Sequence, residues 1–243
     1  IKVCGITGII NINSAEPVKL IELQKMANAI KHRGPDDEGT FLNPNKKVGF
    51  GFRRLSIIDI ANGAQPMSTD DKKTTIVFNG EIYNYRQLRA ELSSVGVVFR
   101  TEGDTEVILE GYRHWGRRLL ERLEGMYAFV LVDRREGIAL AARDPLGIKP
   151  LYIGRKGSLT AFASEARPLH RLIEAQINEE SLAELITFGW AAGRESNFKD
   201  VERLPGGTLI TVPLSGGPLR EHRFSDPLAT LSSTKIEDSL ALE

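Results

Sequence analysis

The chain has 243 residues, enough for one large domain or for one domain with an appendage, and its 32 Lys and Arg residues balance its 32 Asp and Glu residues. Without net charge, and without an apolar run near the roughly 18 residues of a membrane span, the composition gives no reason to expect nucleic acid or a bilayer as a partner. A single cysteine excludes an internal disulfide and a cysteine-pair zinc site, and the first residues lack the apolar stretch of a secretory signal, so we expect a protein of the reducing cytoplasm.

The first predicted elements are a strand and a helix. Residues 3–12 are rich in Ile and Val and end near Asn11, which predicts a buried strand with Cys4 at its start. From Pro17 to Ile30 apolar residues recur at steps of three and four, a spacing typical of an amphipathic helix. The only cysteine therefore lies at the beginning of a strand.

The middle of the chain mixes short apolar runs with helical patterns. Strand-like runs lie at 48–52, 55–60, 74–79, 126–133, 138–143, 151–154 and 159–163, and the fourth and fifth of these predict a hairpin. Helical patterns lie at 84–95, 104–116, 164–174 and 179–188. Because strands and helices do not alternate regularly, the pattern favours an α+β fold.

The last part of the chain changes in composition. After Gly189 it becomes rich in Gly, Pro and Ser and then runs into a polar tail. We expect one domain over residues 1–213 and a linker over residues 214–243 that leads toward a further domain. Within the linker, residues 215–217 (Ser-Gly-Gly) stand between two strand-like runs and predict a hairpin turn.

Cys4 is the first candidate for chemistry. A lone cysteine is more often a small buried hydrophobe than a nucleophile. Here Gly5 leaves the sulfur without a neighbouring side chain, and the position near the chain start brings an α-amine close to it. The ordinary pKa of an α-amine is about 7.7–8.0, against about 10.4 for lysine, so the amine can act as a base at neutral pH. An amino-terminal nucleophile hydrolase works in this way, because one residue supplies both the nucleophile and its base.

Three further positions carry candidate binding groups. Asn79-Gly80 indicates a tight hairpin turn, and a turn that presents the Asn79 amide beside the Gly80 N–H also suits an oxyanion hole. Taken singly, Arg54 is expected to be solvated and Asp104 to cap a helix. As a pair of opposite charges they suit the carboxylate and the ammonium of an amino-acid substrate.

Five motifs follow one another along the chain. They are Cys-Gly-Ile at 4–6, His-Arg-Gly-Pro-Asp at 32–36, Arg-Leu-Ser-Ile-Ile-Asp at 54–59, Asn-Gly-Glu-Ile-Tyr-Asn at 79–84, and Arg-Asp-Pro-Leu-Gly-Ile-Lys-Pro-Leu-Tyr at 143–152. Together they resemble the glutamine-hydrolysing half of asparagine synthetases, which are class II glutamine amidotransferases. The resemblance covers about residues 4–213 and implies a four-layer αββα sandwich of the amino-terminal nucleophile hydrolase type.

The resemblance also implies roles for the candidate residues. Cys4 would attack the side-chain amide of glutamine while its own α-amine relays the proton, and Asn79 with Gly80 would hold the oxyanion. Ammonia would leave, and water would then release glutamate from a thioester on Cys4. The residues that the resemblance assigns to glutamine binding are Arg54, Leu55, Ile57, Gly80, Glu81 and Asp104. Leu55 and Ile57 fit equally well as core residues.

Partners and cofactors follow from the same resemblance. Glutamine would be the substrate, and a C-terminal synthetase domain would use the ammonia for asparagine biosynthesis, with aspartate as the default acceptor. ATP and Mg²⁺ would belong to that domain alone, so we expect no cofactor in this chain. The four histidines are dispersed and predict no metal site. A homodimer is compatible with this interpretation. The alternatives are an inactive module that binds glutamine for regulation, a hydrolase for another amide or a lactam, and an amidotransferase with another acceptor.

The start of the chain complicates the mechanism. Residues 1–3 (Ile-Lys-Val) precede Cys4, whereas the mechanism needs the Cys4 nitrogen as a free amine. A misassigned start site, with Val3 encoded by a GTG start codon, would explain these residues. Cleavage after Val3 or an inactive product would explain them as well, and the sequence leaves the three explanations open.

Overall fold

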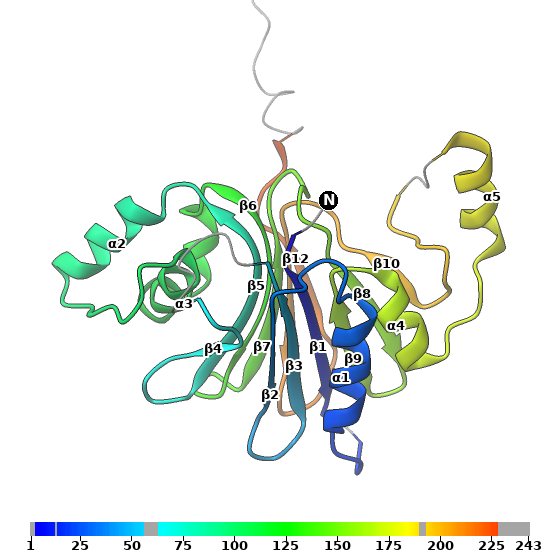
Figure 1. Ribbon diagram of the computed structural model, residues 1–243, viewed down its shortest axis with the longest axis horizontal. Helices are drawn as coiled ribbons and strands as arrows, with labels where there is room; N and C mark the ends of the chain where they lie inside the picture. Colours follow the sequence, from blue (N-terminus) through cyan, green and yellow to red (C-terminus); the bar gives the residue numbers. More distant parts are fainter. Residues whose placement is uncertain (1–2, 13, 56–62, 190–192, 228–243) are drawn as a thin grey trace, which may run out of the picture.

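The computed structural model describes residues 3–12, 14–55, 63–189 and 193–227, and within these ranges the chain forms two facing six-stranded sheets (Figure 1). Sheet A has the strand order β10 (Val201–Arg203), β8 (Tyr152–Lys156), β9 (Leu159–Ala163), β1 (Gly5–Asn11), β3 (Val48–Arg54) and β2 (Asp37–Leu42). Sheet B has the order β12 (Arg220–Arg223), β11 (Thr208–Pro213), β7 (Ile138–Arg143), β6 (Gly125–Asp133), β5 (Thr74–Ile82) and β4 (Met67–Ser68). Paired strands run antiparallel throughout the described ranges.

The helices lie on the outer sides of the two sheets (Figure 1). They are α1 (Leu20–Ala29), α2 (Tyr85–Ser94), α3 (Asp104–Trp115), α4 (Ala166–Ile173) and α5 (Glu179–Phe188), with a 3₁₀ helix, η1 (Gly116–Glu121), directly after α3. The helices α1 and α4 contact sheet A, whereas α3 contacts β5 of sheet B and α2 packs on α3. The order of layers is therefore helices, sheet A, sheet B, helices.

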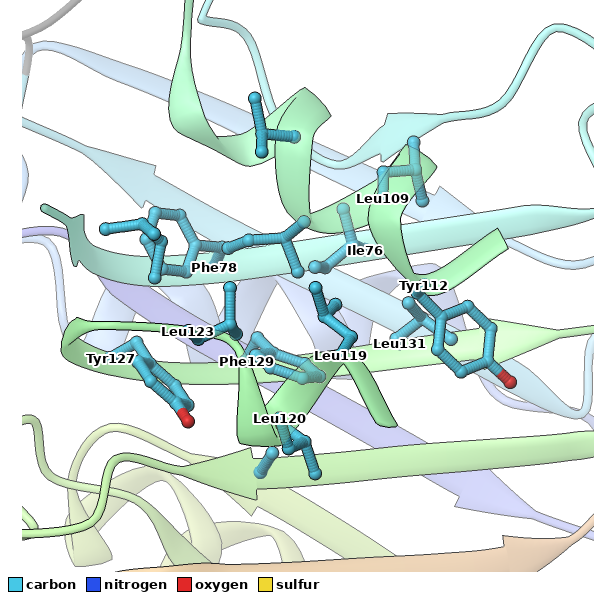
Figure 2. Packing of buried hydrophobic residues seen from close by; sticks show 14 of the residues in the cluster. Ile76, Phe78, Leu109, Tyr112, Leu119, Leu120, Leu123, Tyr127, Phe129 and Leu131 are labelled. Carbon is cyan, nitrogen blue, oxygen red and sulfur yellow. The ribbon is translucent and has the colours of Figure 1, made fainter. Parts of the chain in front are cut away.

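Side chains alternate along each strand between two cores, one between the two sheets and one between a sheet and its helices. In β1, Ile6 and Ile10 face sheet B, whereas Ile9 faces the helices α1 and α4. In β5, Val77 faces sheet A and Phe78 faces α3 and η1. Figure 2 shows this second side, where residues of β5 and β6 pack against the helical layer. Full burial of each such side chain stabilises the fold by about 1.5–3 kcal/mol relative to exposure.

Most predicted elements are present. The strands predicted at 3–12, 48–52, 74–79, 126–133, 138–143, 151–154 and 159–163 correspond to β1, β3, β5, β6, β7, β8 and β9, and the four later helical patterns correspond to α2, α3, α4 and α5. The helix predicted from Pro17 begins at Leu20. Of the run predicted at 55–60, residues 56–60 lie outside the described residues. Among the described residues, no helix is long and apolar enough to cross a membrane.

Three differences bear on the site or on the domain boundary. Asn79-Gly80 is not a hairpin turn, because both residues lie inside β5 and pair with Ala128 and Tyr127 of β6. Sheet pairing along nine residues of β5 outweighs the local turn preference of the dipeptide. The polar strand β2 shows no apolar alternation and was not predicted. Sheet B continues beyond residue 213 through β12, which pairs with β11 around the predicted turn at 215–217.

Candidate active site

A cavity of about 210 Å³ lies at the end of the sandwich where β1 begins and where β3 and β5 end. It is smaller than the roughly 300–1,000 Å³ typical of sites for drug-sized ligands, which suits a small metabolite. The predicted site residues that line it are Cys4, Arg54, Leu55, Asn79, Gly80, Glu81 and Asp104. The structure thus brings all predicted site residues together with one exception. Ile57, the remaining one, lies outside the described residues.

Strand alternation explains why the polar groups meet there. Cys4 continues the inward-facing series of Ile6, and Arg54 stands two residues beyond the inward-facing Phe52 of β3. Asn79 stands two residues beyond Val77 of β5 and is 1% exposed. Each strand therefore turns an apolar series inward along its length and ends that series with a polar group at the cavity.

The thiol of Cys4 is half-buried and lies against the residue that follows β3. Its Sγ donates to the Leu55 carbonyl at 3.6 Å, and the Leu55 N–H lies 3.4 Å from the same sulfur. The Cys4 carbonyl accepts a hydrogen bond from Arg33 Nε at 3.1 Å. Burial raises the pKa of the Cys4 thiol, although the Leu55 N–H and the charges of Arg54 and Lys149 offset part of that rise. A thiol in this environment is protonated at neutral pH and needs a base before it can attack.

The Asn79 amide is the open donor of the cavity. Within the part of the chain that the structure describes, Asn79 Nδ2 is buried without a hydrogen-bond partner. Gly80 beside it has no room for a side chain, because a Cβ atom there would collide with the Met126 carbonyl of β6. A buried donor without a partner is rare in folded proteins, and at the wall of a cavity it is available to a ligand.

Opposite charges face the same space. Asp104 is the first residue of α3, with Gly103 in the capping position, and its Oδ2 accepts a hydrogen bond from the Ile82 N–H at 3.1 Å. The pKa of Asp104 is raised to about 6, mainly by burial and to a smaller extent by the nearby Glu81 carboxylate, while hydrogen bonds from backbone N–H groups offset part of the rise. The N-cap residue of α3 is thus Gly103, although the Asp104 carboxylate still accepts hydrogen bonds from the first N–H groups of the helix, and Arg54 is buried instead of solvated. Arg54, Glu81 and Asp104, from three different elements, therefore place both signs of charge around a space of amino-acid size.

Sequence reasoning missed further residues of the cavity. Lys149 lies within a motif that the sequence displays, but nothing in the motif reveals that its side chain reaches Cys4. Val3 also lines the cavity, directly before the thiol. Gln65 lines it from the segment before β4, where no local pattern marks it.

The described residues contain no cluster of three or more His, Cys, Asp or Glu side chains placed to hold a metal ion. His32 instead pairs with Glu165 at 2.8 Å, and Arg33 contacts the same carboxylate at 3.3 Å. These residues connect the segment after α1 to the start of α4 and hold the backbone next to Cys4.

Known proteins resemble this chain in sequence. A family model described as a glutamine amidotransferase domain matches residues 3–224. Asparagine synthetase [glutamine-hydrolyzing] 1 of Bacillus subtilis is 39% identical over 218 residues, which are 88% of this chain and 34% of that protein. A putative asparagine synthetase [glutamine-hydrolyzing] of Mycobacterium tuberculosis is 41% identical over 203 residues, 78% of this chain and 31% of that protein. The chain spans about a third of the length of these curated relatives.

A solved structure resembles the fold. Glutamine phosphoribosylpyrophosphate amidotransferase from B. subtilis, complexed with ADP and GMP, superposes with a TM-score of 0.66 at 20% identity and covers 91% of this chain and 49% of that one. The predicted α+β class, a four-layer αββα sandwich of the amino-terminal nucleophile hydrolase type, is confirmed.

Proposed function

Since this chain belongs to the glutamine amidotransferase family, we propose that it hydrolyses glutamine to glutamate and ammonia through a thioester on Cys4. The observation that carries the proposal is that Asn79 Nδ2, which has no hydrogen-bond partner among the described residues, lies in the same cavity as the only thiol of the chain. The opposite charges of Arg54 and Asp104 in that cavity favour a zwitterionic amino acid over a simple amide or a lactam.

The charged groups set the direction of the substrate. Arg54 binds the α-carboxylate, and Asp104 with Glu81 binds the α-ammonium. The side-chain amide of glutamine then lies beside Cys4, with its carbonyl oxygen toward Asn79 Nδ2 and the Gly80 N–H. Leu55 contacts the thiol and packs along the aliphatic part of the substrate.

The reaction begins when the α-amine of Cys4 takes the thiol proton. The Sγ then forms a bond to the amide carbon, and the carbonyl electron pair moves to the oxygen that Asn79 and Gly80 stabilise. The protonated amine gives its proton to the leaving nitrogen as the C–N bond breaks, which releases ammonia and leaves the thioester. Water, deprotonated by the same amine, attacks the thioester carbon, and glutamate leaves as the Cys4 thiol is restored.

This sequence requires Cys4 to be the amino-terminal residue. A peptide nitrogen between Val3 and Cys4 has no lone pair available for proton transfer. Because Val3 also lines the cavity, removal of residues 1–3 would both create the base and widen the site. We propose that the active form begins at Cys4.

The use of the ammonia lies outside the residues described above. Because the curated relatives named asparagine synthetase are about three times as long as the matched part, we propose that residues 214–243 lead to an ATP-dependent synthetase domain. ATP, Mg²⁺ and aspartate would bind there, in the cytoplasm. β12 then belongs to the glutamine-hydrolysing domain, and the connection begins after it. A homodimer stays a prediction.

The test measures the rate of glutamine hydrolysis and identifies the residue that a reactive glutamine analogue labels. Protein that begins at Cys4 is expected to release glutamate from glutamine, and a glutamine analogue that carries an electrophilic diazoketone is expected to add once, at Cys4. Cys4→Ala should abolish both while glutamine still binds. Labelling at another residue would contradict the assignment of the nucleophile. Binding of glutamine without any hydrolysis by protein that begins at Cys4 would support the inactive regulatory module instead.

A further inference from the structure

Gln65 lines the cavity and contacts three elements, β5, α3 and β2, although it belongs to none of them. Its side-chain Oε1 accepts a hydrogen bond from the Phe78 N–H of β5 at 2.6 Å. Its Nε2 donates to Thr105 Oγ1 of α3 at 3.3 Å. Its main-chain carbonyl lies so close to Gly39 of β2 that a Cβ atom at Gly39 would collide with it. One half-buried side chain therefore joins the oxyanion side of the cavity to the first turn of α3.

The contact with Phe78 replaces a missing strand partner. The edge strand β4 pairs with β5 only through Met67 and Ser68, opposite Ile76 and Thr75. The preceding residue, Pro66, has no N–H to extend the ladder. The side-chain amide of Gln65 takes the next position and binds the backbone of β5 directly before Asn79.

The contact with Thr105 lies directly after Asp104. Thr105 is buried in the first turn of α3, and Gln65 in the segment before β4 donates a hydrogen bond to it. The two ends of the same planar amide thus bind the neighbours of Asn79 and Asp104. In the proposed function these two residues hold the opposite ends of glutamine, the amide carbonyl and the α-ammonium.

We infer that Gln65 is a positioning residue that fixes the distance between the oxyanion donors of β5 and the carboxylate of Asp104, and so sets the length of the amino-acid amide that the site hydrolyses. The inference rests on the proposed function and deepens it. Asparagine is one methylene shorter than glutamine. When two substrates differ by one methylene, their kcat/KM values in a pocket typically differ by roughly 10–200-fold. Because the planar amide of Gln65 holds the neighbours of Asn79 and Asp104 at a fixed separation, these two residues cannot approach each other to bind the shorter substrate. Discrimination against asparagine can therefore reach that range.

The main test replaces Gln65 with a side chain of similar length that forms neither hydrogen bond. For Gln65→Met we expect kcat/KM for glutamine to fall at least about tenfold, and the preference for glutamine over asparagine to fall by a similar factor. Gln87→Ala is the matched control, because Gln87 is an exposed glutamine on α2, and its kinetic constants should stay within twofold of the parent chain. A thermal unfolding curve for each variant separates a loss of positioning from a loss of folding.

A comparison of two variants separates the effects of the hydrogen bonds that Gln65 forms with Phe78 and with Thr105. Thr105→Val removes only the bond toward α3, so KM for glutamine should rise while kcat stays within about twofold. Gln65→Met removes both bonds and should change KM and kcat together. The double variant should be no worse than Gln65→Met alone, since the Thr105 hydroxyl acts through Gln65. Additive losses would mean that the two residues act separately and would overturn the inference.

The outcome for Gln65 can be distinguished from the outcome for the proposed function. If the parent chain hydrolyses glutamine and Gln65→Met keeps both kinetic constants and the substrate preference within twofold, the inference is wrong and the function stands. If protein that begins at Cys4 hydrolyses no glutamine, the proposed function is wrong, and the role of Gln65 in setting the length of the substrate is wrong as well. Hydrogen exchange of the Phe78 amide then still reports whether Gln65 binds β5: faster exchange in Gln65→Met supports the tie between the elements, and unchanged exchange overturns it.

Discussion

The cavity and the loop that follows β7, residues 144–151, differ in whether their buried polar groups have hydrogen-bond partners. In the loop, Asp144 is 0% exposed and its carboxylate accepts hydrogen bonds from the N–H groups of Tyr127, Ile148 and Lys149. In the cavity, Asn79 Nδ2 has no partner among the described residues. The two regions are adjacent, because Lys149 belongs to the loop and also lines the cavity.

The difference separates stability from function. A buried polar group that finds its partners within the chain holds the backbone in one conformation, and its removal leaves the partners unsatisfied. A buried donor without a partner adds little to stability but is available when negative charge develops on a substrate. Variants of the loop should therefore reduce the free energy of unfolding, whereas variants of the cavity should reduce turnover.

The largest expected effect is on stability, for Asp144→Ala. In this variant three backbone N–H groups lose their hydrogen-bond acceptor, and the buried Arg143 guanidinium loses a nearby negative charge. The free energy of unfolding should therefore fall by about 3–5 kcal/mol. Urea unfolding measures this loss. Glu180→Ala, on the exposed side of α5, should change it by less than about 0.5 kcal/mol. A loss for Asp144→Ala below about 1 kcal/mol would remove the basis of the comparison.

Asn79→Ala tests the cavity. Loss of one oxyanion donor should lower kcat roughly a hundredfold, equivalent to about 2.7 kcal/mol, with little change in KM, since the oxyanion exists only along the reaction path. The thermal unfolding midpoint should stay close to that of the parent chain, because Asn79 Nδ2 has no hydrogen-bond partner in the part of the chain that the structure describes. A change confined to KM would make Asn79 a binding residue instead.

The starting residue of the chain gives an effect of similar size. Protein that begins at Cys4 should hydrolyse glutamine at least about a hundredfold faster than protein that begins at Ile1, a factor in the range of general-base assistance. Mass spectrometry of both proteins establishes which residue is present at the terminus. If the rates are equal and Ile1 is retained, the α-amine is not the base.

Arg54→Ala should affect the binding of glutamine more than its conversion. The variant leaves the α-carboxylate of the substrate without its counter-charge, so KM should rise by about tenfold or more, equivalent to at least about 1.4 kcal/mol. Steady-state kinetics with glutamine and with a simple amide that lacks the α-carboxylate provide the comparison. Hydrolysis of the simple amide as fast as glutamine by the parent chain would contradict the role of Arg54.

The smallest effect is the pH dependence that Asp104 introduces. Because burial raises its pKa to about 6, the carboxylate that binds the ammonium is lost as pH falls below that value, and KM should rise there. Asp104→Asn should raise KM at neutral pH and remove this dependence. The linkage to stability has the opposite sign: the protonated form stabilises the fold below the ordinary pKa of 3.8, and this contribution is lost as pH rises to about 6. A parent-chain KM that stays flat across pH 5–7 would contradict the assignment.

The sequence predicted the elements better than their contacts. Runs rich in apolar residues were sufficient to predict β1, β6 and β7, because strands buried on both faces contain few polar residues. This signal was absent from β2, whose residues are mostly polar and partly exposed. The prediction also failed at Asn79-Gly80, since the turn signal is local whereas the pairing that overrides it comes from β6.

The candidate site shows the same limit. Motifs that resemble a known family contain Cys4 and Arg54, and Asp104 was predicted as the opposite charge to Arg54. The structure brings these three residues together around one cavity. Gln65 carries no such signal. Its contacts are with residues 13 and 40 positions away, and only the folded chain places them side by side.

The position of Asn79 inside β5 also limits how this protein can change during evolution. Side chains alternate between the two faces of a strand, so the insertion or deletion of one residue between Thr74 and Asn79 would turn the amide away from the cavity and toward α3. The turn at residues 70–73, between β4 and β5, can vary in length without this consequence. Homologous sequences that retain the activity should therefore differ in length at that turn and never within the strand.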